Sequence, residues 1–506
     1  MTLIKSISGI RGTIGGYNNN NLTPIDVVKF SAAYGTWIKE QRSKSVYRVV
    51  IGRDARISGE MIQNLVINTL TAMGIDDKTF LKEAKATYKI SSRFEDFSGK
   101  GEVFHYPNGQ TLRTDLTWHQ WMSAREYTMM LPSFAEVFQP AVTIAEAGKL
   151  PLSHKLLHSY DLSRDRSFHI DGKAFSEFLQ RTYCKTIKVV DSKIKSVSYR
   201  GYNVQYVVVG SNNFTFRGEK VYADLYIDCT GQQAVISGKQ SDWIPFDTIL
   251  TDTALVKKID YSITRAEMVP YTNAKGMSAG WEWTIPTWDY ISKGYVFSSK
   301  YQGLEDAFLE FAQEEPRIIQ FQNGRHERGW TANVVSIGLS YGFIEPLEST
   351  SLFNTGHGIL SLMDILDEGP SPGQFARDRF NFNMSEHMDG WREFVEAHYY
   401  YSKRRDTPFW RAVTDEVEYD MTGAHQTIMQ AMITGEEIPH GLDPIVYILA
   451  GSGYSNVNSR LDQYFGTAPV ADEFSAQHWA LQHQTVKCLS DEMPTQHSYL
   501  DKTVWT

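Results

Sequence analysis

The 506-residue chain has few cysteines, no long apolar run and no large excess of either charge. Its three cysteines, Cys184, Cys229 and Cys488, stand far apart, and none belongs to a C-x-x-C pair. We therefore expect neither a disulfide framework nor a thiolate zinc site. The longest apolar runs, at 206–209 and 445–450, are too short to cross a bilayer. Because no signal-peptide pattern opens the chain, we expect a cytoplasmic protein without membrane contact.

Basic residues are slightly outnumbered, with 50 Lys and Arg against 59 Asp and Glu, which gives a formal charge of −9. No basic block interrupts this balance, so nucleic acid is not an expected partner. The apolar fraction of 42% suits a packed globular protein and excludes a mainly disordered chain. The length exceeds what one hydrophobic core usually holds, so we expect two or more packed units.

The general nucleotide and hydrolase motifs are also missing. The G-S-G at 451–453 is followed by Asn456 where a third glycine would complete G-x-G-x-x-G, and no other copy of this dinucleotide fingerprint occurs. There is no Walker loop, no H-E-x-x-H and no G-x-S-x-G. We therefore predict no resident metal site.

What the sequence does offer is hydrophobic periodicity. It predicts helices at 23–40, 59–73, 352–366, 389–403 and 423–434, strands at 46–51 and 87–97, and an antiparallel meander within 185–228. Since strand and helix patterns mix before residue 349 and helices dominate after it, the predicted fold class is α/β (α+β) with a C-terminal helical subdomain.

Three segments are candidates for chemistry. The run D-L-Y-I-D-C-T-G at 224–231 ends at Gly231, which either lets the backbone approach a ligand or closes an ordinary strand end. In G-W-E-W-T-I-P at 280–286, Trp281 and Trp283 share one face of an extended segment. Two indoles on one face either fill a core or wall an apolar tunnel.

The third segment is G-L-S-Y-G-F-I-E-P-L-E-S-T at 338–350, in which two carboxylates and two hydroxyls precede a helical run. A plain helix N-terminus accounts for such residues, because they satisfy free N–H groups and the helix dipole. Alternatively, the N–H groups of Thr350 and Ser351 hold an anion such as a halide.

Taken together, W-x-W-x-I-P and E-P-L-E-S-T resemble the flavin-dependent halogenases, the tryptophan halogenase family. The stretches A-T-Y-K at 86–89, H-I-D-G at 169–172, G-Y-V-F-S-S at 294–299 and D-T-P-F-W at 406–410 agree with this resemblance. It runs from about residue 75 to the C-terminus. It implies a sheet region like that of FAD-dependent monooxygenases, with a helical region over it.

The resemblance also implies the reaction. Reduced FAD and dioxygen oxidise chloride or bromide, and the hypohalous acid passes through a tunnel to a lysine that delivers it to an electron-rich aromatic substrate. The lysine falls on Lys89 and an assisting glutamate on Glu348. A separate flavin reductase is the implied partner, and a homodimer is the assembly that we consider.

The remaining site residues follow from the same resemblance. Predicted flavin contacts are Gly231, Leu339, Thr350, Ser351 and Leu352, of which Thr350 and Ser351 also contact the halide. Predicted substrate-pocket residues are Trp281, Trp283, Phe409, Trp410 and Arg405. Arg405 stands where tryptophan-specific members carry a glutamate for the substrate amine. Because a cation repels an ammonium group, we do not expect free tryptophan to be the natural substrate.

The first 76 residues resemble a different family, the phosphohexomutases. The motifs are I-K-S-I-S-G-I-R-G-T-I-G-G at 4–16 and I-G-R-D-A-R-I-S-G-E-M at 51–61. The T-A-S-H-N-P phosphoserine loop and the D-G-D metal loop of that family are absent, which excludes mutase activity. We therefore predict a chimera in which a mutase-like fragment replaces the Rossmann unit that anchors FAD.

The predicted domains are a mutase-like fragment at 1–76, a flavin and substrate sheet region at 77–345 and a helical region at 346–506. Without the glycine turn that holds a pyrophosphate, we expect FAD binding to weaken by orders of magnitude and activity to be impaired. The alternatives are a non-catalytic or inert fusion product that keeps an aromatic pocket, and a flavin monooxygenase. Hydroxylation alone would not need the lysine and the E-P-L-E-S-T segment.

Overall fold

The computed structural model describes residues 4–6, 9–11, 77–108, 121, 124, 132–157, 160–163, 165–183, 189–190, 192–210, 218–238, 240–348, 350–368, 372–420 and 473–506. The chain divides into two compact units, Met1–Asp77 with Gly356–Met384 and Lys78–Thr355 with Ser385–Thr506. The helices predicted at 23–40, 59–73 and 423–434 and the strand at 46–51 lie outside the described residues. The predicted domain boundaries remain a prediction.

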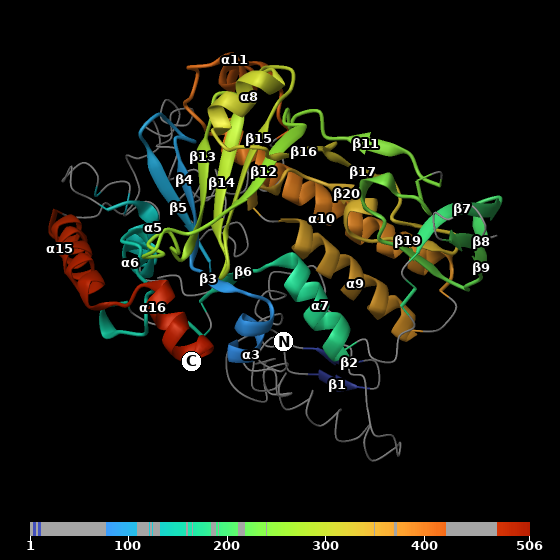
Figure 1. Cartoon of the computed structure of the whole chain (residues 1–506), viewed down its shortest axis with the longest axis horizontal. Helices are drawn as coiled ribbons and strands as arrows, with labels where there is room; N and C mark the ends of the chain where they lie inside the picture. The colour runs from blue at the N-terminus through green and yellow to red at the C-terminus, as the bar shows by residue number, and fades with distance from the viewer. Residues whose placement is uncertain are drawn as a thin grey trace. The chain divides into compact units, whose positions relative to one another are not determined.

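The second unit is organised around a seven-stranded mixed sheet, shown in Figure 1. In spatial order its strands are β16 (Arg317–Gln320), β12 (Thr253–Ile259), β15 (Ile291–Phe297), β14 (Gly280–Pro286), β13 (Tyr271–Gly276), β4 (Ser91–Glu95) and β5 (Val103–Pro107). Neighbouring strands run antiparallel except β13 and β4, which are parallel. The predicted mixed sheet is confirmed.

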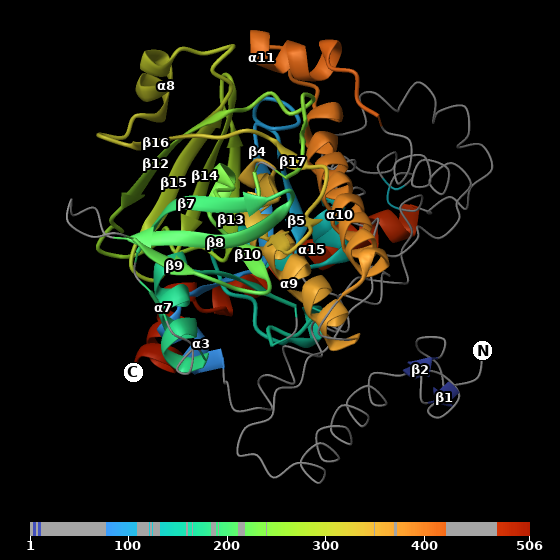
Figure 2. The same ribbon diagram turned by 90° about the vertical axis from the view of Figure 1, so that its right-hand side faces the viewer.

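Three three-stranded sheets also belong to this unit. They are β10 (Tyr226–Asp228), β19 (Val334–Ser336) and β18 (Trp330–Thr331); β11 (Trp243–Pro245), β17 (Gly324–His326) and β20 (Gly342–Phe343); and β7 (Lys193–Arg200), β8 (Asn203–Gly210) and β9 (Glu219–Val221). The last is the predicted antiparallel meander, and Figure 2 shows its three strands side by side. Its inner face packs on Tyr226 and Val334.

The helices described in the chain include the predicted ones at 352–366 and 389–403. They are α3 (Asp77–Glu83), α5 (Phe134–Phe138), α6 (Ala141–Glu146), α7 (Gly172–Tyr183), α8 (Leu304–Phe311), α9 (Thr350–Glu368), α10 (Gln374–Tyr400), α11 (Pro408–Arg411), α15 (Glu473–Leu489) and α16 (Gln496–Leu500). No helix among the described residues has the length and apolar character needed to span a membrane. The first unit also contains a hairpin of β1 (Ile4–Ser6) and β2 (Gly9–Arg11).

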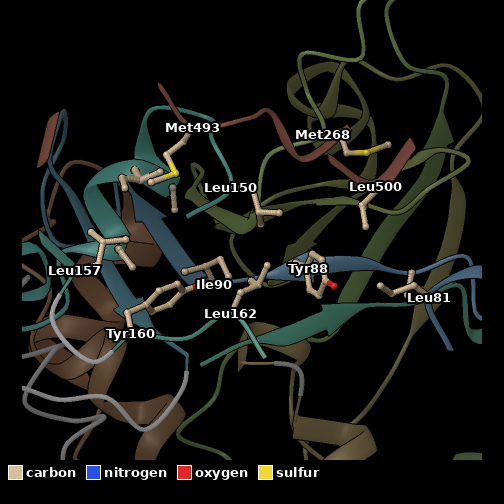
Figure 3. Packing of buried hydrophobic residues seen from close by; sticks show 14 of the residues in the cluster. Leu81, Tyr88, Ile90, Leu150, Leu157, Tyr160, Leu162, Met268, Met493 and Leu500 are labelled. Atoms are coloured by element: carbon tan, nitrogen blue, oxygen red, sulfur yellow. The ribbon is translucent and has the colours of Figure 1, made fainter. Parts of the chain in front are cut away.

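A short two-stranded sheet of β3 (Thr87–Lys89) and β6 (Ser167–His169) lies beside a large hydrophobic cluster. Tyr88, the middle residue of β3, packs in this cluster with Ile90, Leu150 and Leu500, as Figure 3 shows. The cluster therefore joins the start of the second unit to the C-terminal α16. Because side chains alternate along a strand, Thr87 and Lys89 leave β3 on the face opposite Tyr88.

Candidate active site

Lys89, the predicted catalytic lysine, lies on β3 and is only 6% exposed. Thr87, on the same face of this strand, stands directly opposite His169 of β6. The Thr87 hydroxyl donates a hydrogen bond of 2.6 Å to the carbonyl oxygen of Pro286, the last residue of W-x-W-x-I-P. The strand of the lysine and the strand of the two tryptophans are therefore joined by a direct, buried contact.

The two tryptophans share one face of β14, as their spacing predicts. Trp281 is 1% exposed, Trp283 is partly buried, and their ring centroids lie 6.0 Å apart. Gly294 of β15 pairs with Trp283, and a Cβ at this glycine would come within 2.1 Å of the Trp283 indole. Glycine is therefore required at this position, because the indole occupies the space that any side chain would need.

The first glutamate of E-P-L-E, Glu345, is fully buried in a polar network. Its Oε1 accepts a hydrogen bond of 2.6 Å from the Tyr399 hydroxyl, and its Oε2 accepts one from the Thr251 hydroxyl. Its backbone N–H donates to Oδ1 of Asn323 at 2.8 Å. Burial raises the pKa of Glu345, and the hydrogen bonds from Thr251 and Tyr399 offset part of that rise.

This network also reaches the tryptophan strand. The Trp281 indole lies close enough to Glu345 to lower the pKa of that carboxyl slightly, although its buried N–H completes no hydrogen bond. Thr251 and Asn323 also line a cavity of about 330 Å³, whose aromatic lining residues are Trp243, Phe246 and Phe321. The W-x-W-x-I-P and E-P-L-E segments therefore pack together around one buried carboxyl group.

Glu348 ends the short helical turn η4 (Pro346–Glu348), three residues beyond the anchored Glu345. The described part of the structure does not include the side chain of Glu348. It also leaves out residue 349 and the side chains of Thr350 and Leu352. The predicted approach of Glu348 to Lys89 therefore stays a prediction. What the structure adds is that the segment leading to Glu348 is fixed by the network of Glu345.

The predicted flavin contacts Gly231 and Leu339 follow two parallel neighbouring strands. Gly231 begins the turn η2 (Gly231–Gln233) after β10, and Leu339 lies in η3 (Gly338–Ser340) after β19. The Ser340 hydroxyl joins the two turns by donating to the carbonyl oxygen of Asp228 at 2.5 Å. Gly231 has a φ of +75°, which other residues adopt only with strain.

The start of α9 lies at the same ends of β10 and β19, next to the turn that holds Leu339. A Cβ at Gly338 would come within 3.0 Å of the Thr355 hydroxyl, and that hydroxyl donates to the carbonyl oxygen of Ser351 at 2.8 Å. Ligands in open sheets bind outside the carboxyl ends of parallel strands, and helix N-termini attract anions. The backbone at Gly231, Leu339 and Ser351 therefore lies where such ligands bind, and the predicted flavin and halide contacts there stay a prediction.

Asp228, at the end of β10, holds the turn after Gly231 in shape. Burial alone would raise the pKa of its carboxyl group, but hydrogen bonds from Thr230 and Ser237 lower that pKa below its ordinary value. Its Oδ1 accepts from the Thr230 N–H at 2.9 Å, and its Oδ2 accepts from the Ser237 N–H at 2.8 Å. This aspartate therefore serves as an anion that organises backbone N–H groups.

Phe409 and Trp410 are both fully buried, in an aromatic cluster that includes Tyr399. Trp410 donates from Nε1 to the carbonyl oxygen of Met277 at 2.7 Å. Arg405 instead lies at the surface, where its guanidinium pairs with Asp415 at 2.8 Å. The structure thus brings Phe409 and Trp410 close to the Glu345 network but engages Arg405 elsewhere, and the pocket role of all three stays a prediction.

Sequence reasoning missed the roles of Glu345, Tyr399 and His169. Glu345 and His169 belong to stretches that the motifs single out, but the motif alone does not show which side chains face inward, and Tyr399 lies outside every quoted motif. The available signal was an acidic residue in the apolar run G-F-I-E, since a carboxylate at such a position needs buried hydrogen-bond donors.

Comparison with known proteins supports the resemblance of the N-terminal fragment. A phosphoglucosamine mutase of Bdellovibrio bacteriovorus is 40% identical over 77 residues, which cover 15% of this chain and 16% of the mutase. A phosphoglucosamine mutase of Brevibacillus brevis is 28% identical over 161 residues, 29% of this chain and 35% of the mutase. The mutase likeness therefore covers a minor part of the chain, and its predicted end near residue 76 stays a prediction.

Most of the chain resembles halogenases. Tryptophan 6-halogenase SttH of Streptomyces toxytricini is 28% identical over 471 residues, covering 84% of this chain and 87% of the relative. The solved structure of apo VirX1 superimposes with a TM-score of 0.75 at 27% identity, covering 87% of this chain and 91% of VirX1. BrvH, a flavin-dependent halogenase from Brevundimonas sp. BAL3, gives a TM-score of 0.71 at 25% identity, with 86% and 90% covered.

The sequence model of the family named tryptophan halogenase matches residues 43–443. The motifs place the start of the halogenase resemblance near residue 75. The match of the family model begins about thirty residues earlier, so it overlaps the mutase-like fragment. It spans well over half of the chain. This protein therefore belongs to the tryptophan halogenase family.

Proposed function

We propose that this protein is a flavin-dependent halogenase that uses FADH2, dioxygen and chloride or bromide to halogenate an electron-rich aromatic small molecule. One observation carries the proposal beyond family membership. The buried Lys89 stands on a strand that Thr87 ties to the end of the W-x-W-x-I-P strand. We place its amine beside the apolar indoles of Trp281 and Trp283, which would suit an oxidant that water would otherwise consume.

When bound, FADH2 would supply the two electrons that reduce dioxygen, and the reduced oxygen would oxidise the halide. The backbone at Gly231, Leu339 and Ser351 is where we propose that the flavin and the halide bind, with Thr350 and Leu352 next to them. A glycine with φ of +75° at the carboxyl end of β10 leaves room for close approach, since no atom lies within 4 Å of the place of its Cβ.

Lys89 would donate a hydrogen bond from its ammonium group to the hypohalous oxygen and so direct the electrophilic halogen to one ring carbon. The carbon–halogen bond would form as the O–halogen bond breaks, and the departing hydroxide would take a proton from the Lys89 ammonium group and leave as water. The ring carbon would then lose its own proton. We assign the acceptance of that proton to the carboxylate of Glu348, which acts as a general base and can return the proton to the Lys89 amine. Trp281 and Trp283 would exclude water along the path.

The decisive experiment incubates the full chain with a flavin reductase, NADH, FAD, bromide and a panel of indoles and phenols. Brominated product detected by mass spectrometry supports the halogenase. Hydroxylated product without bromine would favour the flavin monooxygenase, and no product with any substrate would favour the non-catalytic module. A reaction without the reductase but with chemically reduced FAD separates a failing reductase from a failing halogenase.

A further inference from the structure

His169 is buried, and the structure fixes which of its two ring nitrogens carries the proton. The Thr87 hydroxyl has a single hydrogen, which it donates to the carbonyl oxygen of Pro286 at 2.6 Å. Its oxygen also lies 3.2 Å from Nδ1 of His169, so Nδ1 must be the donor in that contact. Nε2 then carries no proton and accepts a hydrogen bond of 2.9 Å from the Thr272 hydroxyl.

These contacts join four separate strands at one imidazole ring. His169 belongs to β6, Thr87 to β3, Thr272 to β13 and Pro286 to the end of β14. Thr87 is fully buried, and His169 and Thr272 are both about 5% exposed or less. Both ring nitrogens therefore have partners, and water does not compete for them.

The strand of Lys89 depends on such side-chain contacts. Among the described residues β3 is three residues long and pairs with one strand only, β6. Its side-chain anchors include the Thr87 hydroxyl on Pro286 and the side chain of Gln496, whose Oε1 accepts from the Tyr88 N–H at 2.8 Å. Removing the Thr87 anchor should therefore shift Lys89, since among the described strands β3 is paired on one side only. The next residue, Ile90, is held separately by backbone hydrogen bonds of 2.7 Å with Pro270 and Asn108.

The charge state of the imidazole suits a neighbouring lysine. Burial and then the positive charge of Lys89 lower the pKa of His169 to about 3. The ring is therefore neutral above about pH 4, which preserves the single tautomer described above. An imidazolium would instead place a second cation beside Lys89 and would offer Thr272 a donor where an acceptor is needed.

We propose that His169 is a positioning residue for Lys89: its neutral imidazole, held between the hydroxyls of Thr87 and Thr272, fixes the lysine strand against the end of the tryptophan strand. This inference rests on the proposed role of Lys89 in halogen delivery. It assigns His169 no contact with the substrate, the halide or the flavin.

The test uses the full chain and two readouts. The first is the ratio of halogenated product to NADH consumed, with the rate of flavin reoxidation measured in parallel. The second is the rate at which acetic anhydride modifies Lys89 at several pH values, followed by peptide mass spectrometry. The second readout needs no halogenation, so it remains informative even if the proposed function is wrong.

Thr87→Val and Thr272→Val remove one hydroxyl each without changing the volume much, and His169→Ala removes the ring. We expect each to lower the product ratio by about tenfold, because small misplacements of a catalytic group are costly, while flavin reoxidation changes less than about twofold. We expect His169→Ala and Thr87→Val to change the Lys89 labelling rate by about threefold or more at fixed pH. Thr87→Ser, which keeps the hydroxyl, should restore both values.

His326→Ala is the matched control, because this histidine is also buried and hydrogen-bonded but belongs to β17 in a separate sheet. It should leave Lys89 labelling unchanged while lowering the stability of the fold by a comparable amount.

The proposal is overturned if Thr87→Val and His169→Ala leave the labelling of Lys89 within the range of the control. It is also overturned if Thr87→Ser behaves like Thr87→Val. The wild-type chain could make no halogenated product while the variants still change the labelling of Lys89 as expected. That outcome would contradict the proposed function and support the positioning role.

Discussion

The hydroxyl of Tyr399 donates a 2.6 Å hydrogen bond to Oε1 of Glu345, and both side chains are almost completely buried. These residues lie 54 positions apart, on α10 and on the segment before Glu348. Burial, followed by the neighbouring Glu345 carboxyl, raises the pKa of Tyr399 well above its ordinary value, so the phenol keeps its proton. The pair therefore fixes the E-P-L-E segment to the helix beneath it.

Loss of this hydrogen bond should destabilise the fold. In Tyr399→Phe the buried carboxyl group of Glu345 keeps Thr251 but loses its second donor. We expect the free energy of unfolding to fall by about 1–3 kcal/mol, the usual cost of an unsatisfied buried polar group. Urea unfolding followed by tryptophan fluorescence measures this. A variant as stable as the wild type would show that the contact contributes nothing.

Glu345 should also make stability depend on pH. Its pKa is raised in the folded chain above the ordinary value of 4.5, so the folded chain retains a proton that the unfolded chain releases. The stability contributed by that proton is complete below about pH 4.5 and is lost as pH rises through the folded pKa. Glu345→Gln cannot titrate, so its melting temperature should decline less than that of the wild type between pH 4.5 and 8.

Thermal melts at several pH values test this prediction. Glu305→Gln is the control, since Glu305 is an exposed carboxylate in the first turn of α8. The control should follow the wild-type curve. If Glu345→Gln also runs parallel to the wild type, the carboxyl of Glu345 does not titrate in this range and the prediction is wrong.

Gly294→Ala should displace the Trp283 indole. The added Cβ would lie 2.1 Å from the ring, and the ring, not a flexible chain end, would have to move. Overpacking of this kind costs about 1–3 kcal/mol, and the fluorescence of the displaced indole should shift. Gly390→Ala on α10 is the control, because nothing lies within 4 Å of its Cβ and alanine favours helices. Equal melting temperatures for the two variants would contradict the requirement for glycine at Gly294.

Lys89→Met should separate halogenation from flavin chemistry. It removes the ammonium group and keeps an apolar chain of similar length. We expect halogenated product to fall by at least about 100-fold, the lower end of what a positioned proton-transfer group contributes, while flavin reoxidation changes little. Liquid chromatography of the product and NADH consumption give the two rates. Halogenation that survives in this variant would remove Lys89 from the mechanism.

FAD binding should be weak, because the sequence lacks G-x-G-x-x-G. Each charge-assisted hydrogen bond to a phosphate contributes about 1.5–3 kcal/mol, so the loss of two raises Kd by roughly 100-fold or more. Titration of the chain with FAD, followed by flavin fluorescence, should give a Kd above about 1 µM. A tighter Kd would show that other residues hold the pyrophosphate and would end the expectation of impaired activity.

Substrate charge should influence turnover through Arg405. Asp415 pairs with this guanidinium, and both side chains are about 40% exposed, so solvent screens the charge. Asp415→Asn should raise the preference for indole-3-acetate over tryptamine by about twofold to threefold in kcat/KM, and Arg405→Gln should lower it. A preference that neither change alters would mean that Arg405 lies away from the substrate. Efficient turnover of free tryptophan would contradict the exclusion of that substrate.

Much of this structure follows from local pattern. The alternation in G-W-E-W-T-I-P predicts a strand with Trp281 and Trp283 on one face, and the meander within 185–228 follows from turn residues between apolar runs. The joining of Gly231 to Leu339 is harder to foresee. It depends on the parallel pairing of β10 with β19, which are more than one hundred residues apart.

The buried polar contacts could not be predicted from the sequence. Nothing near Glu345 indicates that Tyr399 and Thr251 would supply its donors, because hydrogen bonds between distant segments depend on how the sheet and helices pack. The same holds for His169, whose partners come from three other strands. Arg405 shows the opposite case, since a neighbouring aspartate ten residues away engages a charge that the family comparison assigned to the pocket.

The anchoring of β3 by the far end of the chain bears on biosynthesis. Tyr88 donates its backbone N–H to Gln496, which is 408 positions later, and its ring packs with Leu500. During translation the strand of Lys89 would therefore lack these neighbours until the segment with Gln496 and Leu500 had left the ribosome. A chain that ended before Gln496 would lack this anchor of the strand that carries Lys89.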